Sequence, residues 1–184
     1  MITAAAAKRV RLLGLDVDGV LTDNGIWIGP AAGERLELKR FDIQDGLGLA
    51  ILRYTAIEVA WLSGRHSEAT ALRARELRVP TLIQEDKARK LPAMERLLAE
   101  KGIEWDELAY VGDDLPDLPI LRRAGLPISV ANATREAKEA AQWVTAAAGG
   151  QGAVREVVEH LLRARGEWDG AVTQYLRERG ETRA

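Results

Sequence analysis

The amino-acid sequence predicts an α/β fold built on a mostly parallel, doubly wound sheet. Short apolar runs alternate along the chain with segments whose apolar residues recur at helical spacing. Strands and helices that alternate in this way are joined by right-handed crossovers, which makes the strands parallel. In addition, three polar clusters each follow an apolar run, and open parallel sheets bind ligands at these carboxyl ends of strands.

The first half of the chain contains three predicted strands and a hairpin. Val10–Val17 is the first strand, and the runs Ile26–Ile28 and Arg35–Phe41 flank the turn-like sequence G-P-A-A-G-E, which predicts a β-hairpin. The remaining elements expected here are helices at Asp45–Tyr54 and Glu68–Leu77 and strands at Ile57–Leu62 and Thr81–Ile83.

The second half continues the alternation. Arg89–Lys101 is an amphipathic helix that Gly102 ends, and Leu115–Ala124 is a helix that Pro116 and Pro119 interrupt early. The other expected elements are strands at Leu108–Val111, Pro127–Val130 and Trp143–Thr145 and helices at Thr134–Ala141 and Ala153–Ala164.

Composition predicts one ordinary globular domain over residues 1–184, with a hairpin flap at about 24–41. The chain is 47% hydrophobic and 29% charged, and its net charge of −2 argues against a general nucleic-acid surface. We expect the charged tail, residues 166–184, to fray, unless Trp168 and Tyr175 dock it on a neighbouring subunit. The absence of cysteine permits a reducing cytoplasm, and no apolar run has membrane-spanning length, so we expect a cytoplasmic protein.

Two aspartates close the first predicted strand. In R-L-L-G-L-D-V-D-G-V-L-T-D, Asp16 and Asp18 stand two positions apart, so in an extended segment their side chains leave the same face. Such a pair is costly to bury without a cation, and Mg²⁺ takes oxygen ligands. The pattern therefore indicates a magnesium site with a nucleophile and an acid/base. A strand end followed by a polar turn is the alternative.

Two further polar clusters follow predicted strands. The sequence S-G-R begins at Ser63, and G-D-D begins at Gly112. The first is a common loop or helix-cap sequence, whereas paired acids after an apolar strand are less usual, although a solvated turn also explains them. Because the carboxyl ends of parallel strands meet at one edge of a sheet, we expect all three clusters to form one site.

Together the clusters fit phosphoryl transfer. Asp16 would attack phosphorus and form an acyl phosphate, while Asp18 would protonate the leaving oxygen and later activate water. Asp16, the backbone carbonyl of Asp18, and Asp113 would hold Mg²⁺. The Ser63 hydroxyl and the Gly64 N–H would bind phosphate oxygens, and a lysine would offset their charge.

These motifs resemble those of a known superfamily. D-V-D-G-V-L-T-D, L-S-G-R and Y-V-G-D-D-L-P-D match, in order and spacing, the phosphatases of the haloacid dehalogenase superfamily. The sequence is more closely similar to the cap-less 3-deoxy-D-manno-octulosonate 8-phosphate (KDO 8-phosphate) phosphatases, through F-D-I-Q-D-G-L-G-L at Phe41–Leu49 and G-G-Q-G-A-V-R-E-V at Gly149–Val157. The resemblance covers about Val10 to Leu162 and implies a Rossmann-like core with a β-hairpin flap and no cap domain.

The resemblance also implies site residues. Among them are the catalytic Asp16, Asp18 and Ser63, the metal ligands Asp16, Asp18 and Asp113, and substrate contacts at Thr22, Gly64 and Arg65. Two lysines remain open for the phosphate contact, because Q-E-D-K-A-R-K-L lacks the family's glycine after Gln84 and is one residue longer. Lys90 is favoured because Leu91 and the following helix keep the family's register, and Lys87 is the alternative.

The implied activity is Mg²⁺-dependent hydrolysis of KDO 8-phosphate through an aspartyl-phosphate intermediate, which supplies the sugar acid for lipopolysaccharide synthesis. Gln44 stands where the family often has arginine, so a nonulosonate 9-phosphate or a broad range of sugar phosphates is the alternative substrate. An aspartyl-phosphate switch of the receiver type is the non-enzyme alternative. The family further implies a homotetramer in which the hairpin and tail of one subunit close a neighbour's site, and Trp27 and Ile28 are compatible with such an interface.

Overall fold

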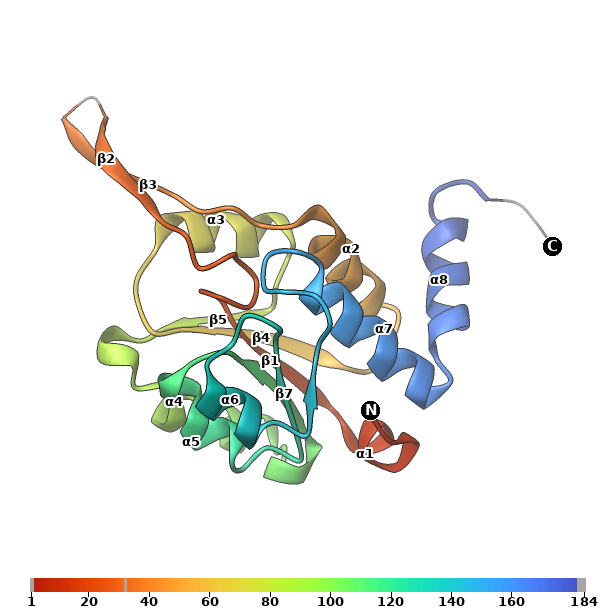
Figure 1. Ribbon diagram of the computed structural model, residues 1–184. Helices are drawn as coiled ribbons and strands as arrows, with labels where there is room; N and C mark the ends of the chain where they lie inside the picture. Colours follow the sequence, from red (N-terminus) through yellow and green to blue (C-terminus); the bar gives the residue numbers. More distant parts are fainter. Residues whose placement is uncertain (1, 32, 182–184) are drawn as a thin grey trace.

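The predicted fold class is confirmed by the computed structural model, which describes residues 2–31 and 33–181 (Figure 1). Six strands form a parallel sheet in the order β5-β4-β1-β6-β7-β8. The order reverses at β1, so the loops after β1 and its neighbours open into one crevice. The strands are β1 (Leu12–Asp16), β4 (Glu58–Ser63), β5 (Thr81–Gln84), β6 (Leu108–Gly112), β7 (Leu126–Ser129) and β8 (Trp143–Val144).

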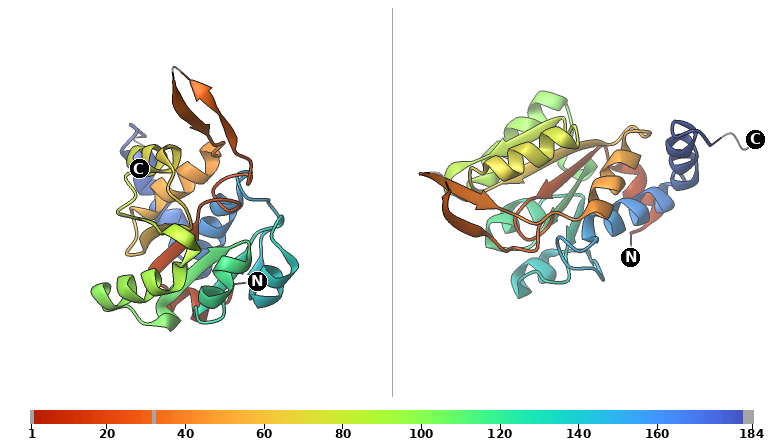
Figure 2. Two further views of the ribbon diagram at one scale, coloured as in Figure 1. Left: turned by 90° about the vertical axis from the view of Figure 1, so that its left-hand side faces the viewer. Right: turned by 90° about the horizontal axis from the view of Figure 1, so that it is seen from above.

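Helices cover both faces of this sheet, as Figures 1 and 2 show. On one face lie α1 (Ala4–Arg9), α2 (Ile43–Leu52), α3 (Glu68–Glu76) and α7 (Ala153–Arg165). The other face carries α4 (Lys90–Lys101), α5 (Leu118–Leu121) and α6 (Arg135–Ala140). Three short 3₁₀ turns, η1 (Asp86–Ala88), η2 (Trp105–Glu107) and η3 (Leu115–Asp117), complete the connections.

The central strand β1 is buried over its whole length. Both faces of a parallel sheet pack against helices, which is why its sequence is a continuous apolar run and does not alternate. Gly14 lets the Tyr110 ring approach, because a Cβ at Gly14 would lie 2.8 Å from that ring. Tyr110 is itself fully buried, so the core extends directly beneath the carboxyl end of β1.

The hairpin, β2 (Trp27–Ala31) and β3 (Glu34–Leu38), projects from the body of the molecule (Figure 1). At its base, Thr22 and Phe41 form an isolated antiparallel bridge, and the Phe41 ring stacks on Trp61 of β4. The base is therefore fixed to the sheet. Between residues 18 and 63 the structure describes only this hairpin, α2 and β4 outside the loops, so no cap domain lies in that part of the described chain.

The C-terminal segment is a helix, so the prediction that it frays is wrong for the described residues. Helix α8 (Trp168–Arg177) packs on α7 and α2 of the same chain. Trp168 is buried with the Arg155 and Arg163 guanidinium groups over its ring, and Tyr175 meets Tyr54 edge to face. Docking within the chain provides the buried surface that a charged tail would otherwise lack. Residues 182–184 of the predicted tail lie outside the described residues.

One other segment differs from the sequence-based expectation. The predicted helix Leu115–Ala124 is split into η3 and the short α5, because Pro116 and Pro119 each stand at the start of a helical turn and lack an N–H to continue one. The N-terminal segment forms α1, where Arg165 of α7 donates to the carbonyls of Ala7 and Val10. In residues 2–31 and 33–181, no helix is both long and apolar enough to cross a membrane.

Candidate active site

Asp16 and Asp18 stand at the carboxyl end of β1, as the sequence predicts. Asp16 is the last residue of the strand and is buried, whereas the Asp18 side chain, in the loop that follows, is 21% exposed. The loop turns at Gly19, whose φ of +93° suits glycine, and a Cβ there would lie 2.0 Å from an Asp113 carboxylate oxygen. The D-x-D-G motif thus brings two strand ends into contact.

A buried lysine joins two of the acids. Lys90, at the start of α4, is 4% exposed, and its Nζ lies 2.6 Å from Asp16 Oδ1 and 2.8 Å from Asp117 Oδ1. The Val17 N–H also donates to Asp16 Oδ1. Both donors bind the same oxygen of Asp16, so among the described residues Asp16 Oδ2 is left without a protein donor.

Four buried residues, Asp16, Lys90, Asp113 and Asp117, form the floor of the site, and Asp117 connects the others. Its Oδ1 accepts from Lys90 and from the Tyr110 hydroxyl, and its Oδ2 accepts from the N–H groups of Asp113 and Asp114. Both oxygens are therefore engaged by protein donors. Asp117 thus orients both the loop after β6 and the lysine.

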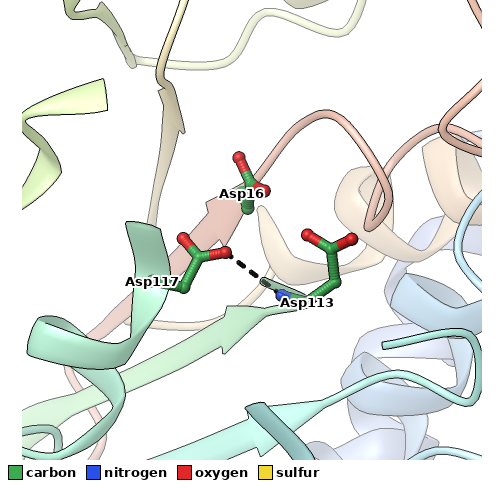
Figure 3. A group of neighbouring side chains, drawn as sticks. All are labelled: Asp16, Asp113 and Asp117. Carbon is green, nitrogen blue, oxygen red and sulfur yellow. Dashed lines mark hydrogen bonds between the residues drawn. The ribbon is translucent and has the colours of Figure 1, made fainter. Parts of the chain in front are cut away.

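Asp16, Asp113 and Asp117 form a compact acidic cluster whose oxygen atoms lie within 4.8 Å of one another (Figure 3). Asp113 is 3% exposed; its Oδ1 is buried without a partner, and its Oδ2 receives only a long bond of 3.4 Å from Asn24. Three carboxylates share one ammonium group, which leaves a deficit of positive charge. Because Asp117 is already saturated, Asp16 and Asp113 are the side chains that fit a divalent cation.

The pKa values reflect this crowding. Burial, reinforced by the Asp117 charge, raises the pKa of Asp16 well above its ordinary value although Lys90 opposes the shift. Burial likewise raises the pKa of Asp113 to about 6. Burial alone would lower the pKa of Lys90, but Asp16 and Asp117 outweigh it and raise that pKa, so the ammonium stays charged. A cation bound between Asp16 and Asp113 would favour their ionised forms and so lower both raised pKa values.

A cavity of about 190 Å³ opens above this floor. Its lining comes from the carboxyl ends of β1, β4, β5 and β6 and the segments that follow them: Asp16, Asp18, Asn24, Gly64, Arg65, Ala88, Lys90, Asp113, Asp114, Pro116 and Asp117. Gly64 is needed for the close approach of Ala88, since a Cβ at Gly64 would lie 2.9 Å from that of Ala88.

The rim of the cavity is held by the base of the hairpin. Glu37 of β3 accepts two bonds from the Arg65 guanidinium, at 2.5 and 3.1 Å, and one from the Ser67 hydroxyl. The bond from Arg65 is the main cause that lowers the pKa of Glu37 to about 2. On the same side, Lys39 Nζ lies 2.7 Å from Asp18 Oδ1.

Three predicted site residues lie elsewhere than expected. The Ser63 hydroxyl donates to the Arg65 carbonyl and does not line the cavity. Thr22 is buried, and its hydroxyl oxygen accepts from the N–H groups of Gly19 and Asn24, so it shapes the loop and does not face the cavity. Lys87 is exposed with a φ of +63° and stands outside the site, whereas Lys90 lies in it.

Comparison with known proteins agrees with this architecture. A family model described as haloacid dehalogenase-like hydrolase matches residues 80–157. The 3-deoxy-D-manno-octulosonate 8-phosphate phosphatase KdsC of Escherichia coli (strain K12) is 43% identical over 172 residues, which span 94% of this chain and 89% of that protein.

Solved structures agree as well. The KDO 8-phosphate phosphatase of Moraxella catarrhalis, crystallised with a magnesium ion, a phosphate ion and KDO, superposes with a TM-score of 0.87 at 40% identity over 94% of this chain and 97% of that chain. The phosphatase from Yersinia pestis gives 0.85 at 39% identity over 91% and 89%. This chain belongs to the KDO 8-phosphate phosphatase family. Its Rossmann-like core with a hairpin flap is therefore the haloacid dehalogenase fold.

The family sequence G-G-Q-G also has a structural explanation. Gly149 packs against the loop after β1 so closely that a Cβ there would lie 1.8 Å from the Gly19 carbonyl oxygen. Asn132 ties the two loops together, because its amide donates to the Gly19 carbonyl and its oxygen accepts from the Gly149 N–H. Asp45 of α2 then accepts from the Arg155 N–H at the first turn of α7. These segments brace the loop that carries Asp18.

The sequence analysis missed Lys39, Glu37, Tyr110 and Asn24. Tyr110 stands within the quoted Y-V-G-D-D-L, yet nothing in an apolar strand shows that its hydroxyl reaches Asp117. Glu37 and Lys39 alternate with Leu36 and Leu38 in L-E-L-K. That period-two pattern places Glu37 on the opposite face of the ribbon from the two leucines. The alternation was the one feature of the sequence that could have pointed to Glu37.

Proposed function

We propose that this chain is a Mg²⁺-dependent phosphatase that hydrolyses KDO 8-phosphate through an aspartyl-phosphate intermediate, acting as one domain in the cytoplasm. The observation that carries the chemistry is the arrangement of Asp16: Lys90 and the Val17 N–H hold one carboxylate oxygen, and the other receives no donor from the residues that the structure describes. A nucleophile needs one free oxygen in a fixed orientation, and this geometry provides it.

The proposed reaction uses the two aspartates in turn. Asp16 attacks phosphorus, the ester P–O bond breaks, and the protonated Asp18 carboxyl gives its proton to the departing sugar oxygen. Asp18 then takes a proton from water as that water attacks the phosphorus, and Asp16 leaves as a carboxylate with phosphate released. Asp16, Asp113 and the Asp18 carbonyl would hold Mg²⁺, which supplies neutralisation of the phosphoryl oxygens.

The surrounding groups fit a phosphoryl substrate. Lys90 lies at the floor of the cavity, and Gly64 and Arg65 also line it, so cationic and N–H groups lie around the space next to Asp16. Thr22 and Ser63, which do not reach the cavity, are not part of this proposal as direct ligands in the state described. Gln44 is exposed at the start of α2 and does not line the cavity of its own chain.

The test is Mg²⁺-dependent phosphate release from a panel that includes KDO 8-phosphate, a nonulosonate 9-phosphate and several hexose phosphates. A kcat/KM for KDO 8-phosphate at least tenfold above every other compound supports the proposed substrate. Preference for a nonulosonate phosphate would change the proposed substrate and leave the proposed mechanism as it is. Failure to release phosphate from any of them would contradict the proposal.

We also propose that the chain acts as a homotetramer in which hairpins meet. Trp27 pairs with Leu38 across the hairpin, and both are more than half exposed, at 58% and 52%. Leu36 lies on the same face at 44% exposed. An apolar ribbon face of this kind is typical of an interface between subunits. In sedimentation velocity, Trp27→Ser with Leu38→Ser should shift the assembly towards monomer, and an unchanged sedimentation coefficient would contradict the proposed interface.

A further inference from the structure

The base of the hairpin places a second buried lysine beside the site. The side chain of Lys39 is fully buried, and its Nζ lies 2.7 Å from Asp18 Oδ1. It also donates to the Thr70 hydroxyl at 3.0 Å and lies 4.0 Å from Glu37 Oε1. A buried ammonium group is costly unless it is paired, so this lysine needs the neighbours that it has.

Lys39 stands behind Asp18 and does not line the active-site cavity. Asp18 Oδ1, the oxygen that faces Lys39, is buried and meets the ammonium as an ion pair without hydrogen-bond geometry, whereas the side chain as a whole is 21% exposed and lines the cavity. The ammonium therefore takes one oxygen of the carboxylate, and the exposed remainder of the group faces the space where the substrate would bind.

Asp18 has no comparable support from its own loop, since among the described residues Lys39 is its one ion-pair partner. Arg65, the nearest alternative cation on the rim, is already bound through both terminal nitrogens to Glu37. Lys39 itself is fixed from two sides, by Thr70 of α3 and by the bridge between Thr22 and Phe41 at the base of the hairpin.

We propose that Lys39 is a positioning residue that holds the Asp18 carboxyl in the orientation needed to protonate the departing sugar oxygen. The inference rests on the proposed function, and it deepens that function by connecting the hairpin to the chemical step. Lys39 does not contact the substrate, so its effect passes through Asp18 alone. It is consequently expected to matter for leaving groups that need a proton and not for those that leave as stable anions.

The experiment compares Lys39→Met with the unmodified chain on KDO 8-phosphate, whose sugar alkoxide needs a proton, and on p-nitrophenyl phosphate, whose phenolate does not. The parameter is kcat/KM, which covers the steps up to departure of the leaving group and so excludes water activation. We expect a loss of about tenfold or more on the sugar phosphate and less than about threefold on the aryl phosphate. Asp18→Asn should show the same pattern, more strongly.

Two controls separate positioning from folding. Lys101→Met removes an ion pair with Glu58 at the opposite end of the sheet and should leave the ratio of the two kcat/KM values unchanged. Because the chain has no cysteine, Lys39→Cys can be alkylated uniquely in denaturant and refolded beside an equally treated unmodified chain. 2-Bromoethylamine restores an ammonium group at this position and should recover the ratio, whereas iodoacetamide should not.

Equal losses on both substrates, or no loss on either, would overturn the inference while the unmodified chain remains active. If Lys39→Met does not fold, the two alkylated forms of Lys39→Cys provide the test. An equal ratio of the two kcat/KM values in both forms would also overturn the inference. An unmodified chain that releases phosphate from neither compound would instead contradict the proposed function, and the inference would fall with it.

Discussion

The floor and the rim of the active site are built in different ways. The floor consists of Asp16, Lys90, Asp113 and Asp117, all less than 5% exposed, and short ion pairs join Lys90 to Asp16 and Asp117. The rim consists of Asp18 and Arg65, which are partly exposed and are held from behind by two residues of the hairpin base. Strand ends supply Asp16 and Asp113 of the floor, whereas a segment that leaves the sheet supports the rim.

The floor residues mainly balance charge, whereas the residues behind the rim mainly orient side chains. On the floor, three acids and one lysine lie within a low-dielectric interior, so removing the lysine leaves uncompensated negative charge, whereas removing one acid also takes away a group needed for the chemistry. On the rim, Asp18 and Arg65 are partly exposed, so water screens their charges and the loss of either one costs less stability. We therefore expect floor substitutions to affect both stability and activity, and rim substitutions to affect mainly kinetics.

The largest expected effect is that of Asp16→Asn. The amide cannot form the acyl phosphate, so phosphate release should fall by at least about 10⁴-fold, the range seen when a catalytic nucleophile is removed. Steady-state phosphate release from KDO 8-phosphate measures this, with the exposed Asp106→Asn as the active control. A variant that kept more than a hundredth of the activity would show that Asp16 is not the nucleophile.

Lys90→Met should have the next largest effect, and it tests the floor as an electrostatic unit. Removing the buried ammonium leaves three acids without a cation, so the free energy of unfolding without Mg²⁺ should fall by about 3–5 kcal/mol. Urea denaturation in EDTA measures the loss, and added Mg²⁺ should recover part of it because the cation replaces the missing charge. A loss below about 1 kcal/mol would show that Lys90 contributes no more to stability than a partly exposed ion pair does.

Magnesium affinity should depend on pH through the floor. The pKa of Asp113 is raised to about 6 when no metal is bound, so below that pH a proton occupies the carboxyl and must be displaced. The Kd for Mg²⁺ should therefore rise at least about tenfold for each pH unit below 6. Calorimetric titration with Mg²⁺ between pH 5 and 7.5 measures this, and an affinity independent of pH would mean that neither raised carboxyl binds the ion.

Glu37→Gln should have the smallest effect on stability and so sharpens the contrast. Glu37 has a pKa of about 2 and is ionised at any working pH, so the substitution removes a full charge from the rim. Because Arg65 is 31% exposed, we expect less than about 1 kcal/mol of lost stability. Without its partner Arg65 loses its fixed orientation, and KM for KDO 8-phosphate should rise about threefold to tenfold. A loss of several kcal/mol would show that the rim is as tightly coupled as the floor.

Sequence and structure agree on the position of the residues that follow the ends of strands. Asp16, Asp18 and Asp113 follow apolar runs, and parallel strands bring such ends to one edge. Lys90 was favoured over Lys87 by helix register, and the structure places Lys90 in the site. Ser63 and Thr22 were placed too close to the substrate, because a motif does not reveal that its hydroxyl is already bonded to its own loop.

The sequence by itself determined the alternation of strands and helices, the carboxyl edge as the site and the acids that form it, because these follow from local periodicity and short-range spacing. Tertiary structure decided which cation meets which carboxylate. Lys39 reaches Asp18, and Glu37 reaches Arg65, only because the hairpin base is fixed against β4. It also decided that α8 folds back on α2 and α7. Contacts between segments distant in sequence depend on how whole elements pack, which local patterns do not encode.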